Sequence, residues 1–323
     1  MDNLIDLLRD VGATGLTICD AREAPTNEGA LPGIVRIGTH RSGPLPVGDL
    51  DGFDILLSAA EDAPAPWVAV THMDGALDDL RKAMAGQPLA AAVLAQVLRI
   101  TLALDVDSAL MVESLAYSAL MASHGFRRWL GARTPKPVRR DHGPRVRLDR
   151  AGETVEIVLN RPRGRNAIDA AMRDALCGAL EFAALDPDQA PIVLRGEGAV
   201  FSVGGDLAEF GRADDAAAAH AIRMLRSPAR LLYAVRDRAT AHLHGPCIGA
   251  GIEIPAAAGR LIARPRTSFR LPEVMMGVIP GAGGTATIPR RIGRQRACWM
   301  ALSGAAIDLP TAVAWGLVDD VHR

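Results

Sequence analysis

The chain has 323 residues, a formal net charge of −1, and a hydrophobic share of 49%. That length suits one large domain or two ordinary ones, and the composition allows a sizeable core. The charge balance gives no basic excess for binding nucleic acid, and no apolar run is long enough to predict a membrane helix. We therefore expect neither nucleic-acid nor membrane partners. The N-terminal sequence lacks the pattern of a signal peptide, so we expect a cytoplasmic location.

The first 132 residues give a mixed pattern of short strands and helices. Apolar runs predict strands at 34–37 and 53–57, and helical periodicity predicts helices over 77–84, 89–104 and 108–123. Pro88 suits the first turn of the second helix. Asp107 can cap the third helix, and Gly125 is placed to end it.

A segment rich in proline and arginine predicts a linker over 133–148, which contains three prolines and six basic residues. Strands and helices alternate after it. The expected strands are 155–159, 191–194 and 239–243, and the expected helices run from an Asp169 N-cap through Leu185 and, after a glycine turn, through about Val235. Alternation of this kind predicts an α/β layer fold.

Two glycine turns are the first candidates for chemistry. Gly204-Gly205-Asp206 and Gly249-Ala250-Gly251 put small residues where strands meet helices. Such turns leave backbone N–H groups open to a ligand, and two N–H groups aimed at one point would form an oxyanion hole. Each turn alone is also what tight helix packing requires, so neither is specific by itself.

Two glutamates accompany these turns. Glu253 lies in the otherwise apolar stretch IGAGIEIPAAAG, where a carboxylate is costly unless it has a partner or a function. Glu273 follows Pro272, where an ordinary solvent-exposed acid is an equally good interpretation.

Other polar and aromatic residues favour structural roles. His242 and His244 would share one face of a strand, but no third ligand accompanies them, so we expect no metal site. Asp206 is expected to cap the next helix. The aromatic residues Trp67, Tyr117 and Trp129 are expected in the core or at an interface.

Taken together, the motifs resemble the crotonase (enoyl-CoA hydratase/isomerase) superfamily. The strings VEIVLNRP with RNAID, FSVGGDL, GAGIE, LPEVMMGVIPGAGGT and AWGLVDDV occur in the order and spacing of that family across residues 155–321. The resemblance implies a crotonase-like core of β-β-α spiral turns with a helical cover.

The resemblance also implies residue roles. Gly205 and Ala250 match the two oxyanion-hole donors, although many family members have glycine at the second position. Glu253 and Glu273 match the two glutamates of the hydratases. The remaining matches fall where the family contacts coenzyme A: Arg165, Asn166, Ala167, Phe201, Ser202, Val203, Gly204 and Gly249.

The implied activity is the addition of water to a 2-enoyl-CoA thioester. Coenzyme A would be part of the substrate, and no separate cofactor is expected. An enoyl-CoA isomerase or a C–C hydrolase on the same fold is one alternative. A non-catalytic acyl-CoA-binding subunit is another, but it would have no reason to keep both glutamates.

The N-terminal part departs from the family pattern. Crotonases continue into several helices after the segment that AWGLVDDV matches, and residues 79–132 resemble that section in their helix–proline–helix layout. We expect residues 76–132 to replace this cover. The alternative is an unrelated helical accessory domain. Residues 1–75 have no assigned role, 133–148 form the linker and 149–323 the core. The family resemblance implies a homotrimer or hexamer.

Overall fold

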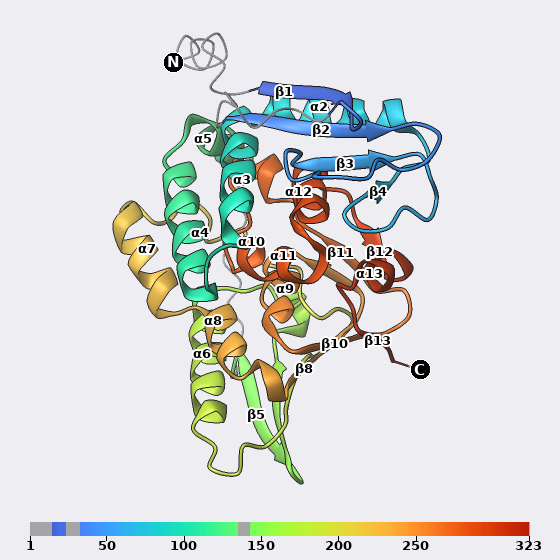
Figure 1. The fold of residues 1–323 in the computed structure, drawn as a ribbon. Helices are drawn as coiled ribbons and strands as arrows, with labels where there is room; N and C mark the ends of the chain where they lie inside the picture. The colour runs from blue at the N-terminus through green and yellow to red at the C-terminus, as the bar shows by residue number, and fades with distance from the viewer. Residues whose placement is uncertain (1–14, 24–32, 135–142, 323) are drawn as a thin grey trace.

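The computed structural model describes residues 15–23, 33–134 and 143–322, which form three β-sheets and the helices around them (Figure 1). The expected α/β class is confirmed. Within these ranges, no single helix is long and apolar enough to cross a membrane. One pair bent by 108°, Met73–Gly86 with Pro88–Thr101, reaches that length and composition only when its two helices are taken together.

The N-terminal sheet has four parallel strands in the order β1-β2-β3-β4. Their bounds are Gly15–Asp20, Ile34–His40, Ile55–Ser58 and Val68–Ala69. The expected strands correspond to β2 and β3, whereas β1 and β4 were not anticipated. Nearly every residue of β2 and β3 is buried, as expected of parallel strands that are covered on both faces.

The second sheet has six strands in the order β13-β10-β8-β7-β6-β5, parallel except where β5 pairs with β6. The strands are β5 Val146–Ala151, β6 Thr154–Leu159, β7 Ile192–Gly196, β8 Ala239–Leu243, β10 Arg260–Ala263 and β13 Asp320–Val321. A third sheet, in the order β12-β11-β9, contains Ile307–Asp308, Ser268–Arg270 and Pro246–Ile248. All three strands that were expected after the linker are present.

Helices cover these sheets. Helix α6 (Ala170–Ala184) begins as expected, because the Asp169 side chain accepts a hydrogen bond from Met172 N. The other helices beyond residue 143 are α7 Ala216–Leu225, α8 Pro228–Ala234, α9 Ala250–Glu253, α10 Gly284–Thr287, α11 Pro289–Ile292, α12 Arg294–Ser303 and α13 Leu309–Trp315. Short 3₁₀ turns are η1 Pro162–Gly164, η2 Arg236–Arg238, η3 Pro255–Ala257 and η4 Glu273–Met276.

The N-terminal helices are α2 Met73–Gly86, α3 Pro88–Thr101, α4 Val106–Met121 and α5 His124–Gly131. Pro88 occupies the first turn of α3, as expected. Two boundary predictions were wrong. Asp105, and not Asp107, caps α4 by accepting from Ser108 N. Gly125 lies inside α5 instead of ending α4, because Ser123 starts a new helix by accepting from Phe126 N.

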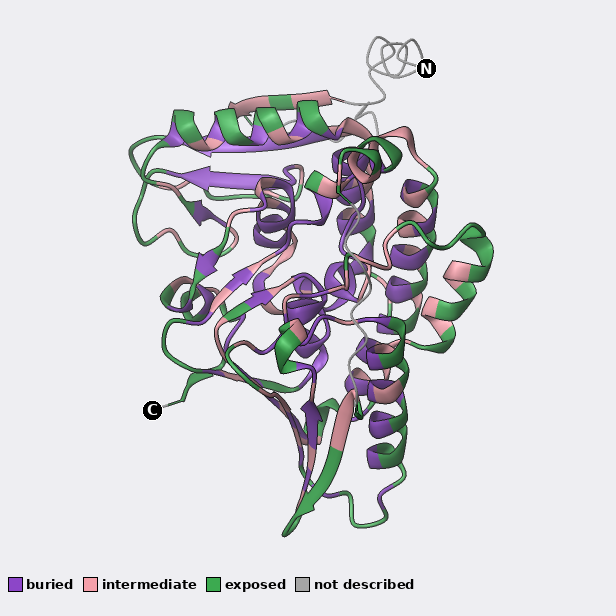
Figure 2. Cartoon of the chain, turned by 180° about the vertical axis from the view of Figure 1, so that it is seen from behind, coloured by how far each residue is buried: buried purple, intermediate pink, exposed green. Residues whose placement is uncertain are grey.

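One hydrophobic core runs from the N-terminal sheet into the rest of the chain, and Figure 2 shows its buried residues. Helix α12 packs against α2, α3 and β3. Arginines on α12 add polar bridges, since Arg294 Nη1 donates to Phe53 O (2.9 Å) and Arg296 Nε to Trp67 O (2.9 Å). The N-terminal sheet and helices therefore pack closely on the α/β core.

The predicted linker is described only in part. Residues 135–142 lie outside the described ranges, and residues 146–148 already belong to β5. Whether α2–α5 take the place of the helices that follow the core in other crotonases stays a prediction.

Candidate active site

The two glycine turns lie against each other. The segments that carry them are joined where Ile248 N donates to Ser202 O (3.2 Å). Gly204 has φ +84°, and a Cβ there would overlap Ile248 O and approach Ala250 N to 3.4 Å. Only glycine tolerates both that backbone conformation and that contact. Ile168 N then donates to Gly204 O (2.8 Å), which fixes the first turn from its other side.

The N–H groups of Gly205 and Ala250 are open. Neither donates to an acceptor among the described residues, and both residues line the same cavity. Ala250 is the first residue of α9, and the first N–H groups of a helix have no partner within the helix. Two unpaired donors on touching turns are the arrangement that an oxyanion hole requires.

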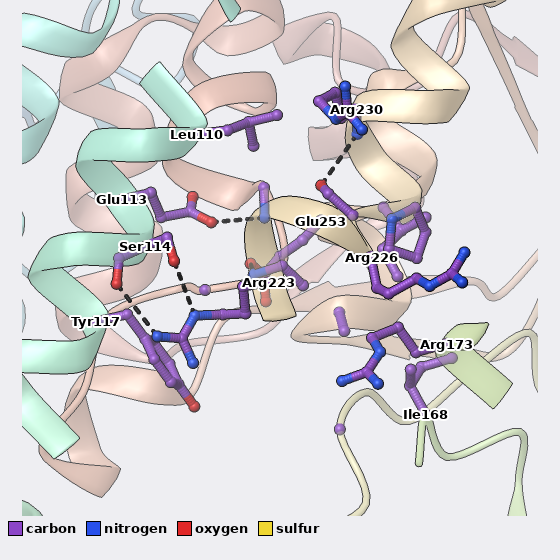
Figure 3. A pocket seen from close by; sticks show the side chains of 18 of the residues that line it. Leu110, Glu113, Ser114, Tyr117, Ile168, Arg173, Arg223, Arg226, Arg230 and Glu253 are labelled. Atoms are coloured by element: carbon purple, nitrogen blue, oxygen red, sulfur yellow. Dashed lines mark hydrogen bonds between the residues drawn. The ribbon is translucent and has the colours of Figure 1, made fainter. Parts of the chain in front are cut away.

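This cavity has a volume of about 270 Å³ and also contains Glu253 and Glu273. Figure 3 shows Glu113, Ser114 and Tyr117 entering it from α4. Residues of α7 and α8 line it as well, so the cavity lies between the core and the N-terminal helices.

The carboxyl groups of Glu253 and Glu273 both approach Gly249. A methyl group built at Gly249 would overlap Glu273 Oε1 and lie 3.8 Å from Glu253 Oε1. Glu273 is buried, with 8% of its surface exposed, so its interpretation as a solvent-facing acid is wrong. Its Oε2 has no hydrogen-bond partner among the described residues. The structure thus places both predicted glutamates together beside the two open N–H groups.

Glu253 is held by the segment before α10. Its Oε2 accepts from Ala282 N (2.8 Å) and Gly284 N (3.0 Å). A second buried acid, Glu113 of α4, accepts from Gly283 N (2.7 Å), Thr285 N (2.8 Å) and Thr285 Oγ1 (2.7 Å). Three carboxyl groups therefore meet at this cavity.

Burial raises the pKa of all three carboxyl groups, because a desolvated carboxylate loses its hydration. The pKa of Glu113 rises to about 7 and that of Glu273 to about 8. The pKa of Glu253 rises well above its ordinary value through burial and then through the negative charges of Glu273 and Glu113. The N–H groups of Ala282 and Gly284 oppose the rise at Glu253, and the backbone of Glu273 itself opposes the rise at Glu273.

Comparison with known proteins decides the family. A family model described as enoyl-CoA hydratase/isomerase matches residues 150–322. The chain belongs to the enoyl-CoA hydratase/isomerase (crotonase) family. The 2,3-dehydroadipyl-CoA hydratase of Escherichia coli (strain K12) is 36% identical over 174 residues, which are 54% of this chain and 68% of that protein. A probable enoyl-CoA hydratase, echA8 of Mycobacterium leprae (strain TN), is 34% identical over 165 residues, 51% of this chain and 63% of that protein.

Solved structures agree with this assignment. The enoyl-CoA hydratase from Thermoplasma volcanium GSS1 superposes with a TM-score of 0.52 at 32% identity, covering 56% of this chain and 72% of that one. A putative enoyl-CoA hydratase/isomerase from Mycobacterium abscessus gives 0.51 at 35% identity, covering 55% and 70%. The matched part spans roughly two thirds of the length of these curated relatives and leaves much of the N-terminal half of the chain unmatched.

The residues of this crotonase that were expected to contact coenzyme A lie outside the cavity lining. Asn166 Nδ2 donates to the carbonyls of Glu197, Val200 and Phe201, and Ser202 Oγ donates to Asn166 O (2.7 Å). These two side chains therefore hold the loop in place. Gly204 and Gly249 adjoin the two N–H donors. Contacts from these and from Arg165, Ala167, Phe201 and Val203 to coenzyme A stay predictions.

The expectation for Asp206 was wrong, because it does not cap a helix. It accepts from Ala208 N (3.0 Å) and pairs with Arg161 (2.6 Å), while Asp215 caps the next helix. Tyr117 packs against the core, as expected, and it also lines the cavity.

The two histidines considered as metal ligands, His242 and His244, make separate contacts. His244 Nε2 contacts Gly198 O (3.0 Å), and the His242 ring packs against that of His322. Within the described ranges, no cluster of three His, Cys, Asp or Glu side chains could hold a metal ion.

Glu113 is the main site residue that the sequence analysis missed. Its signal was present, because it is a lone acid in the apolar helical stretch ALMVESLAYSAL, as Glu253 is in its own segment. What the sequence did not show was that α4 would reach residues 283–285. Arg223 and Arg230 were missed as well, because they belong to an ordinary-looking amphipathic stretch.

Proposed function

We propose that the protein is a hydratase-type lyase that adds water to a 2-enoyl-CoA thioester. The observation that supports it best is the placement of two buried glutamates around Gly249 beside two unpaired N–H groups. Hydration needs one group for the water and one for the α carbon, and this site offers a carboxyl for each.

In this mechanism, the thioester oxygen accepts hydrogen bonds from Gly205 N and Ala250 N. These donors stabilise the enolate-like charge that develops when water attacks the β carbon, and such donors contribute roughly 3–4 kcal/mol each. Glu253, whose anion is stabilised by Ala282 N and Gly284 N, orients the water and takes its proton. Glu273, protonated near neutral pH, delivers a proton to the α carbon.

The alternatives differ in what they ask of the two acids. An isomerase moves a proton between two carbons and needs one carboxyl in the site, and a C–C hydrolase also uses the oxyanion hole. A non-catalytic acyl-CoA-binding subunit needs neither acid. Three buried carboxyl groups with raised pKa values are costly to keep without a reaction, which favours the hydratase.

Coenzyme A enters this proposal as part of the substrate, and the chain needs no further cofactor. A trimer or a hexamer, inferred from the family resemblance, and a cytoplasmic location also stay proposals.

A labelling experiment tests the reaction type. The enzyme is incubated in H₂¹⁸O with a panel of 2-enoyl-CoA and 3-enoyl-CoA thioesters, and the products are analysed by mass spectrometry. A hydratase places one ¹⁸O on the β carbon of the acyl group. An isomerase shifts the double bond without gaining oxygen, and a C–C hydrolase shortens the acyl chain. Either of the last two results would overturn the proposal.

A further inference from the structure

Four arginines line the cavity, and they fall into two kinds. Arg173 and Arg226 pair with surface acids, Asp174 at 2.8 Å and Glu181 at 3.4 Å. Arg223 of α7 and Arg230 of α8 have no carboxylate within ion-pair distance among the described residues. Both side chains are partly buried. A partly desolvated cation is stabilised by a neighbouring anion, which the described residues do not supply to these two arginines.

Arg223 is held in a fixed position. Its Nε donates to Ser114 Oγ (3.0 Å), its Nη2 donates to Ser114 O (3.3 Å) and to Ser118 Oγ, and its guanidinium lies 4.9 Å from the centre of the Tyr117 ring (Figure 3). Nη1 has no acceptor within the described ranges. Neutral oxygens thus orient the group without neutralising it, and burial lowers the pKa of Arg223.

Arg230 adds a second unmet donor. Its Nε is buried and has no hydrogen-bond partner among the described residues. Apolar side chains, including Leu110, Met224 and Ile254, line the same cavity. An apolar cavity with a few fixed charged groups is suited to a ligand that is a hydrocarbon chain with a charged group.

The position of Arg223 indicates which part of a substrate it would meet. Ser114, which accepts from Arg223, directly follows Glu113 in α4. Glu113 accepts hydrogen bonds from N–H groups of the same short segment whose other N–H groups bind Glu253. Arg223 and Glu113 are also close enough for their charges to interact. The phosphates of coenzyme A are separated from the thioester by the whole pantetheine arm, so an anion near the reacting carbons belongs to the acyl group.

We propose that the acyl group of the substrate ends in a carboxylate, which Arg223 binds while Arg230 supplies a second positive charge. The substrate class is then a 2-enoyl-CoA with a carboxylate at the far end of its acyl chain. This inference rests on the proposed function for the acyl-CoA site, but it concerns binding and can be tested separately from turnover.

The test compares two 2-enoyl-CoA thioesters of equal chain length, one ending in a carboxylate and one in a methyl group. We expect the wild type to prefer the carboxylated substrate in kcat/KM. Arg223→Gln should lower kcat/KM for that substrate by about 10- to 100-fold, the usual range for losing a hydrogen-bonded charge. The methyl-ended substrate should change by less than about threefold. Arg230→Gln should act in the same direction, and Arg223→Lys should recover part of the preference.

Arg212→Gln is the matched control, because it removes an exposed arginine that does not line the cavity. It should leave both substrates unchanged. Circular dichroism and thermal unfolding verify that each variant folds.

Several results would overturn the inference. Equal loss on both substrates would mean that Arg223 acts on Glu113 or on a phosphate of coenzyme A, and weaker binding of free coenzyme A by Arg223→Gln would identify the phosphate. A wild-type preference for the methyl-ended substrate would also contradict it.

If neither thioester is hydrated, the proposed function fails but this inference is still tested. Calorimetry with the two saturated acyl-CoA thioesters then decides. Tighter binding of the carboxylated one, lost in Arg223→Gln, supports the carboxylate site, and equal binding overturns it.

Discussion

Glu113 and Glu253 bind alternate N–H groups of one four-residue segment. Glu253 accepts from Ala282 and Gly284, and Glu113 accepts from Gly283 and Thr285. Glu113 belongs to α4, far from the core motifs in the sequence. An N-terminal helix therefore fixes the loop that positions a candidate catalytic acid.

Glu113→Gln should lower both the stability of the protein and the pKa of Glu273. One N–H group loses its acceptor, which should lower the free energy of unfolding by roughly 1–3 kcal/mol. The negative charge of Glu113 also raises the pKa of Glu273, so its removal should shift the alkaline limb of kcat/KM to lower pH. Urea unfolding and a pH–rate profile measure the two effects. Glu181→Gln, the same change on an exposed residue, should show neither, and an unshifted pH profile in Glu113→Gln would limit Glu113 to a structural role.

Gly204→Ala should abolish most activity through the geometry of the oxyanion hole. Its Cβ would overlap Ile248 O and press on the turn that carries Ala250 N, so we expect kcat to fall by about 10² or more. Gly43→Ala is the control, since Gly43 has the same φ of +84° with nothing within 4 Å. Both variants bear the backbone strain, and only Gly204→Ala should lose turnover. Full activity in that variant would argue against the assigned hole.

Protein stability should fall as pH rises, in part through Glu273. Its pKa is about 8 in the folded protein against an ordinary 4.5, so the folded state holds the proton more tightly. The stabilisation is complete below about pH 4.5 and is lost as pH rises through about 8. Glu273→Gln cannot titrate and should flatten this dependence by up to about 1.4 kcal/mol per pH unit. Urea unfolding at pH 5, 7 and 8.5 measures it, and identical slopes in both proteins would contradict the raised pKa.

Removing residues 1–140 should leave residues 141–323 insoluble or inactive. Helix α12 would lose its cover of α2, α3 and β3, and residues 283–285 would lose Glu113. Co-expression of residues 1–140 with residues 141–323 should restore soluble, active protein, because the contacts between the two parts are non-covalent. A soluble and fully active fragment 141–323 would show that the N-terminal part is a dispensable accessory domain.

Part of the candidate active site could be predicted from the sequence, because the residue patterns that indicate it are local. Glycine turns indicate close backbone contacts. A single acidic residue in an apolar stretch indicates that the carboxylate has a partner or a function. These signals singled out the two glycine turns and Glu253, whereas the roles of Gly205, Ala250 and Glu273 came from the family resemblance. The structure brings all four residues to one cavity. Their spatial arrangement followed from the family resemblance, and not from the residues alone.

The contribution of α4 to the site could not be predicted from the sequence, because it depends on packing between segments that are distant in the chain. Nothing near Glu113 in the sequence indicates that its partners are Gly283 and Thr285. For a similar reason, only two strands of the N-terminal sheet, β2 and β3, were predicted from the sequence. Strands β2 and β3 contain short apolar runs, whereas β4 has two residues and depends on pairing with β3.

The most direct measurement is the steady-state hydration of 2-enoyl-CoA thioesters, followed by the loss of enoyl absorbance, in wild type, Glu253→Gln and Glu273→Gln. Each substitution removes one positioned acid or base, so kcat should fall by about 10²–10⁴ while folding and coenzyme A affinity change little. The panel should include acyl groups with and without a terminal carboxylate. Wild-type hydration that survives in either variant at a near-normal rate would contradict the role assigned to that glutamate.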